Sequence, residues 1–135
     1  MSDSPKLALA RYQAVAFETE LPTATPHRVI QLLLEGALSR LATAQRAMAD
    51  GQLAEKGECI ARVIDIVGEL RASLNQDYGS LVEQLDNLYR YVIETLLIAH
   101  QSNDPARLSE ASEVLREIKL GWDAIADESL PPAAA

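Results

Sequence analysis

Apolar side chains recur along most of the chain every three or four residues, the spacing that gathers them on one face of an α-helix. Turn signals divide this pattern into four segments. We expect helices over about 26–48, 52–76, 80–101 and 105–126. Because the connections between them are short, the pattern predicts an all-α fold, an antiparallel up-down four-helix bundle. No stretch alternates strictly between apolar and polar residues for long enough to indicate a strand.

Residue types at the expected helix starts support these bounds. Thr25 followed by Pro26 suits an N-cap and a first helical position. Ser80 is the expected N-cap of the third helix, and Asn103 or Asp104 that of the fourth.

Two flanking segments lie outside the expected bundle. We expect residues 1–25 to form an N-terminal arm with a short, apolar, helical stretch from Leu7 to Phe17, followed by a polar linker. Residues 127–135 are rich in Pro and Ala, and we expect a disordered tail there. The bundle itself takes the residues between them, 26–126.

The apolar faces of the helices differ in width. On a helical wheel, the apolar arc of 52–76 covers roughly 160° and that of 80–101 roughly 140°, whereas 105–126 has an ordinary stripe of roughly 100°. Tight packing inside the bundle is one explanation for the surplus. An exposed apolar groove that binds a partner is the other, because contiguous exposed apolar surface marks interaction sites.

Composition excludes several classes of protein. The chain has 135 residues, 48% of them apolar, and a formal net charge of −8. This charge argues against binding nucleic acid through its phosphates. No apolar run approaches the roughly 18 residues of a membrane span, and the first residues do not read as a signal peptide, so we expect a cytoplasmic protein without membrane insertion.

Candidate catalytic and metal-binding residues are few. The only histidines are His27, expected to be exposed in a first helical turn, and His100, near a helix end whose dipole suits a cation. Cys59 is the only cysteine, and we expect it in the core, with Trp122 as a core anchor. No Glu stands three residues before a histidine, and no nucleophile elbow or phosphate-binding loop occurs. We therefore predict no enzyme activity, metal or cofactor.

The order of several short segments carries a family resemblance over roughly residues 10–125. These segments are Tyr12, Thr23-Ala24-Thr25-Pro26, Leu32-Leu33-Leu34-Glu35-Gly36-Ala37-Leu38, Glu69-Leu70-Arg71-Ala72-Ser73-Leu74, Gly79, Leu85-Asp86-Asn87-Leu88-Tyr89-Arg90-Tyr91 and Trp122. In this order the chain resembles the flagellar secretion chaperone (FliS) family. It departs from the family pattern at Leu34, where a Tyr is usual, and at Glu35, where an Asp is usual.

The resemblance implies a non-enzymatic, cytoplasmic export chaperone. Such a protein binds the C-terminal segment of flagellin, prevents premature filament polymerisation and assists delivery to the flagellar type III export apparatus. The resemblance also implies that an N-terminal arm covers the apolar site when no client is bound. In this chain the covering residues would be Leu9, Tyr12 and Phe17.

The wide faces of the second and third helices supply the candidate client-binding residues. The pool is Ile60, Val63, Ile66, Val67, Leu70, Leu85, Leu88, Tyr89, Val92 and Leu96, of which some must be core. Three alternatives stay open. The protein could be a helical adaptor or regulator for another amphipathic-helix client, its spare faces allow a homodimer without client, and a small enzyme or metal-binding bundle is the least favoured.

Overall fold

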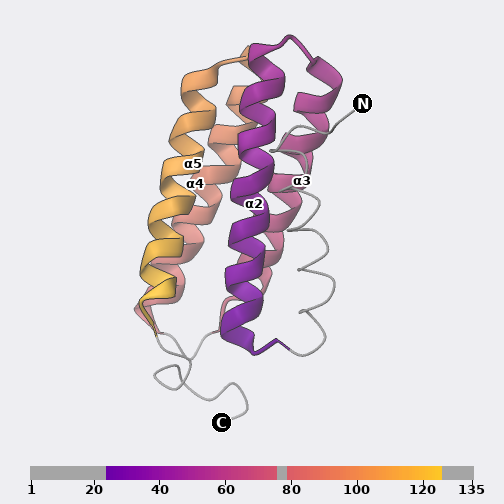
Figure 1. The fold of residues 1–135 in the computed structure, drawn as a ribbon. Helices are drawn as coiled ribbons and strands as arrows, with labels where there is room; N and C mark the ends of the chain where they lie inside the picture. Colours follow the sequence, from indigo (N-terminus) through magenta and orange to yellow (C-terminus); the bar gives the residue numbers. More distant parts are fainter. Residues whose placement is uncertain (1–23, 76–78, 126–135) are drawn as a thin grey trace.

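Four helices packed as a bundle make up the fold in the computed structural model, which describes residues 24–75 and 79–125 (Figure 1). They are α2 (Pro26–Ala49), α3 (Leu53–Ala72), α4 (Ser80–Ser102) and α5 (Pro105–Asp123). The all-α bundle predicted from the sequence is confirmed. Nearly all of the expected arm and the whole expected tail lie outside the described residues.

Each helix packs against the next one along the chain, and α2 also packs against α5, which closes the four helices into a ring. Polar contacts show that neighbours run in opposite directions. Near the start of α3, Lys56 donates to the carbonyl oxygen of His100, close to the end of α4. Near the end of α3, Arg71 pairs with Asp86, close to the start of α4, at 2.8 Å. The bundle is therefore antiparallel.

Side-chain caps begin two of the helices. The side chains of Thr25 and Asp104 accept hydrogen bonds from backbone N–H groups of the first turns of α2 and α5, at 3.1 and 3.0 Å. The cap at Thr25 was expected, and Asp104 is one of the two candidates expected for α5, but the cap predicted at Ser80 is wrong. Ser80 is already helical, and Gly79 precedes it with a positive φ of 63°, which glycine reaches without steric cost.

The core lies along the axis of the ring and takes side chains from all four helices. Cys59 and Trp122 are buried, as the sequence predicts. The two tyrosines of α4 differ in burial: Tyr89 is only 3% exposed, whereas Tyr91 points outward from the same helix. The hydroxyl of Tyr89 has no hydrogen-bond partner among the described residues, and burial raises its pKa to about 12.

Candidate binding groove between α4 and α5

Most of the residues in the predicted client-binding pool belong to the core. Seven of the ten are buried, namely Ile60, Val63, Val67 and Leu70 on α3 and Tyr89, Val92 and Leu96 on α4. The reason is that α3 packs against both α2 and α4, so two neighbours cover its wide apolar arc. Tight packing therefore accounts for most of the surplus on α3.

The other three residues of the pool are at least partly accessible. Ile66 is half-buried on the side of α3 that faces α2. Its Cδ1 lies 3.9 Å from the position that a Cβ at Gly36 of α2 would take. Leu85 and Leu88 lie instead on the side of α4 that faces α5, and both line a groove between these two helices.

The groove has a volume of about 310 Å³ and is partly open to solvent. Its α4 wall consists of Leu81, Leu85 and Leu88. The opposite wall consists of Val114, Glu117, Ile118, Gly121 and Trp122 on α5, with Ile125 just after the helix. Leu81 and Leu88 remain 38% and 41% exposed, so the apolar lining is accessible to a partner. One turn beyond Leu88, Tyr91 donates a hydrogen bond to Glu110 and bridges the two helices next to the groove.

The sequence pattern missed the contribution of α5. Its narrow apolar stripe was expected to serve the core alone, yet Ile118 and Ile125 are only partly buried and line the groove. Val114 and Gly121 stand beside that stripe and widen the accessible face. The sequence did contain one indication of this wider face, because Val114 is an apolar residue that lies outside the narrow stripe.

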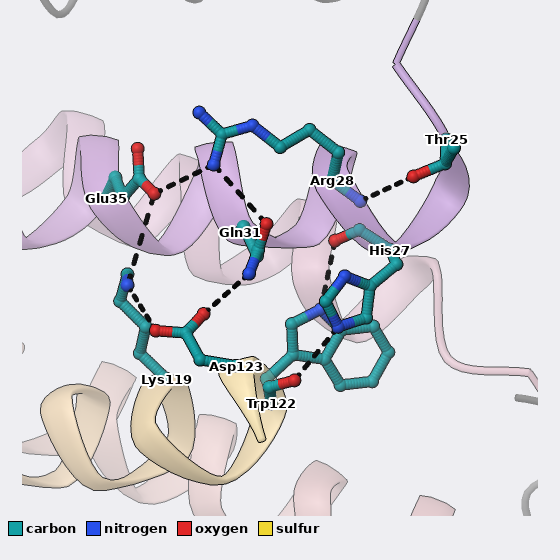
Figure 2. Close-up of polar contacts among 8 residues, drawn as sticks. All are labelled: Thr25, His27, Arg28, Gln31, Glu35, Lys119, Trp122 and Asp123. Carbon is teal, nitrogen blue, oxygen red and sulfur yellow. Dashed lines mark hydrogen bonds and ion pairs between the residues drawn. The ribbon is translucent and has the colours of Figure 1, made fainter. Parts of the chain in front are cut away.

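A reciprocal contact between His27 and Trp122 holds the α5 wall against α2 (Figure 2). The Trp122 Nε1–H donates to the carbonyl oxygen of His27 at 3.0 Å, and His27 Nε2 lies 2.9 Å from the carbonyl oxygen of Trp122. Because a carbonyl oxygen only accepts, His27 Nε2 carries the proton. The two rings stack with centroids 5.1 Å apart. The expectation of an exposed His27 is wrong: it is 8% exposed, because its position in the first turn faces the end of α5.

A polar network beside this contact also joins α2 to α5 (Figure 2). Arg28 pairs with Glu35 at 3.0 Å, and Gln31 donates to Asp123 at 2.8 Å across the two helices. Lys119 hydrogen-bonds Asp123 at 2.5 Å and holds the pKa of that carboxyl below its usual range. Together these contacts fix the end of α5 that carries the groove.

The chemistry of the described residues suits binding. Within 24–75 and 79–125, no three His, Cys, Asp or Glu side chains gather as a metal site. None of the helices in this part of the chain is long and apolar enough to cross a membrane. Burial raises the pKa of the Cys59 thiol, with the Glu55 carboxylate adding to the effect. The described residues form a helical bundle with an apolar groove between α4 and α5.

Fold and groove together define a helical-bundle binding protein. The family model described as "Flagellar protein FliS" matches residues 8–129. Flagellar secretion chaperone FliSB of Pseudomonas aeruginosa is 46% identical over 119 residues, covering 87% of this chain and 94% of that protein. Flagellar secretion chaperone FliS of Vibrio cholerae is 36% identical over 122 residues, covering 90% of both chains. The chain belongs to the FliS family of flagellar secretion chaperones, which is non-enzymatic.

Proposed function

We propose that the protein is a cytoplasmic export chaperone for flagellin. It binds the C-terminal segment of flagellin, prevents premature filament polymerisation and assists delivery to the flagellar type III export apparatus. The observation that carries this proposal is the similarity to flagellar secretion chaperones along nearly the whole chain.

The accessible apolar groove supports the same function on physical grounds. A segment that assembles with its own kind exposes an apolar face, and a chaperone must cover that face to prevent assembly. Each large apolar side chain sheltered from water contributes about 1.5–3 kcal/mol. Ordering a disordered client costs about 2–5 kcal/mol, so several such contacts support sub-micromolar binding. From the predicted pool, Leu85 and Leu88 are the contacts we propose, because both line the groove.

Calorimetry with the C-terminal segment of the flagellin from the same organism tests the proposal. The full-length chain is titrated with this segment, and a peptide of the same composition in scrambled order is the control. We expect saturable binding of the native segment alone. An absence of binding at tens of micromolar would refute the function, and binding of an unrelated amphipathic helix with equal affinity would favour a general helical adaptor.

The N-terminal arm is proposed to regulate access to the client site. Leu9, Tyr12 and Phe17 lie outside the described residues, and their covering role follows from the family resemblance. Deleting residues 1–20 should leave client affinity unchanged or raise it, because a competing segment is removed. A large loss of affinity in the same calorimetric assay would contradict a covering arm.

Self-association without client is a separate property that the exposed apolar surface allows. Sedimentation of the full-length chain with and without the flagellin segment tests it. A dimer that dissociates as the flagellin segment is added would show that a second copy of the chain and the client compete for one face. A monomer in both conditions would refute the homodimer.

A further inference from the structure

Gly121 leaves a gap in the side chains that line the groove, at a position where the packing of the bundle does not require a glycine. It lies in the last turn of α5, and a Cβ built on it would meet no atom within 4 Å. Alanine is favoured over glycine inside helices by up to about 1 kcal/mol. Because no neighbour among the described residues resists a side chain there, internal packing does not explain the glycine. Its effect is to leave bare backbone lining the groove.

Glu117 lies one turn before Gly121 and is the only ionisable side chain in the lining. It is exposed, and it forms no ion pair within 24–75 and 79–125. A carboxylate at the edge of an otherwise apolar groove attracts a cationic group, and the low polarity of the lining strengthens that attraction.

The shape of the groove suits a helix. Leu81, Leu85 and Leu88 follow one another at spacings of four and three residues, so they form a single ridge along α4. At 1.5 Å per residue this ridge is about 10 Å long, or about two helical turns. A helix laid between α4 and α5 therefore has room to insert two successive turns of its apolar face.

We propose that the α4–α5 groove receives an amphipathic helix from the client, with an apolar side chain seated over Gly121 and a Lys or Arg beside Glu117. This inference rests on the proposed function and names the site and the chemistry of the segment that it takes. Charge complementarity selects a basic amphipathic helix over an acidic one, because the chain has a net charge of −8 and the lining has a single, negative, charged group.

A side chain added at Gly121 tests the seat for the apolar residue. Gly121→Leu fills the opening, whereas Gly68→Leu is the matched control, since a Cβ at Gly68 in α3 also meets no atom within 4 Å and Gly68 does not line the groove. We expect Gly121→Leu to weaken binding of the flagellin segment at least tenfold and Gly68→Leu to change it less than twofold. Urea unfolding of both variants verifies that the fold is retained. Equal losses in the two variants would overturn the assignment.

Charge reversal at Glu117 tests the basic contact. Glu117→Lys and Glu94→Lys change the net charge equally, but Glu94 lies on the exposed side of α4 outside the groove. We expect a loss of about five- to tenfold for Glu117→Lys, with a weaker dependence of affinity on salt, and little change for Glu94→Lys. Identical behaviour of the two variants would show that only the overall charge matters.

The emission of Trp122 reports directly on the site, because it is the only tryptophan of the chain and lines the groove. A flagellin segment without tryptophan should shift this emission along the same saturation curve as the calorimetric heat. Binding by calorimetry with an unchanged Trp122 emission would overturn the groove site and leave the chaperone function standing. If the unaltered chain gives no heat of binding with the flagellin segment, the proposed function itself is refuted.

Discussion

Replacing His27 by alanine removes a contact whose value follows from its geometry. One buried hydrogen bond to the carbonyl oxygen of Trp122 is lost, worth about 0.5–1.5 kcal/mol. The stacked arrangement, with ring centroids 5.1 Å apart, contributes about another 0.5–1.5 kcal/mol. The carbonyl of Trp122 still accepts from the backbone N–H of Ile125 at 3.1 Å, so no orphaned acceptor adds to the loss. We expect the free energy of unfolding to fall by about 1–3 kcal/mol.

A double-mutant cycle measured by urea denaturation isolates the pair. His27→Ala, Trp122→Leu and the double variant are unfolded with circular dichroism as the signal, because Trp122 fluorescence is lost in two of them. Both hydrogen bonds go to backbone carbonyl oxygens that the substitutions leave in place, so the coupling energy reports the ring stacking alone, and we expect about 0.5–1.5 kcal/mol. His27→Gln is the informative control, since its amide can still donate to the carbonyl while the stacked ring is gone.

Additive effects would refute this reasoning. If the double variant is destabilised by the sum of the single variants within about 0.3 kcal/mol, the stacking of the two rings does not stabilise the fold. Thermal unfolding gives a second measure, because each kcal/mol lost lowers the Tm of a domain of about 100 residues by about 4–8 °C.

Three further predictions concern single residues away from this contact. Tyr89→Phe removes a buried hydroxyl without a partner among the described residues, so urea denaturation near neutral pH should show an unchanged or slightly raised free energy of unfolding. Since the pKa of Tyr89 is raised to about 12 in the folded state, the unfolded chain releases this proton first, and stability should fall between about pH 10 and 12 less steeply in Tyr89→Phe than in the unaltered chain. Asp104→Ala loses the N-cap of α5 and should cost about 1 kcal/mol in the same assay, whereas a loss below about 0.3 kcal/mol would show that the cap is dispensable. The Cys59 thiol, buried and with a raised pKa, should react with a disulfide reagent at neutral pH far more slowly in the folded protein than in urea, and equal rates would contradict its burial.

Periodicity and cap signals were enough to place the four helices, because both depend on residues close together in the sequence. The width of an apolar arc was harder to interpret. A wheel shows that α3 is apolar over a wide face, but it does not show how many neighbours cover that face. Val63 and Val67 are fully buried because α3 contacts both α2 and α4.

The groove and the His27 contact depend on residues that are distant in the sequence. His27 and Trp122 are 95 positions apart, and the local pattern around His27 is that of an ordinary first turn. The groove likewise arises from two helices, so the narrow stripe of α5 gave no reason to place Ile118 at an accessible site. Leu85 and Leu88 were in the predicted pool, but the sequence could not separate them from buried members such as Val92.

The closure of the ring by α2 and α5 has a consequence for synthesis on the ribosome. α2 can pack against α5 only after α5 has emerged from the ribosome, because their contact joins His27 to Trp122. Both walls of the α4–α5 groove also need that last helix. A nascent chain that ends before α5 therefore has α4 without its partner wall, and the α4–α5 groove forms only with the final turns of the bundle.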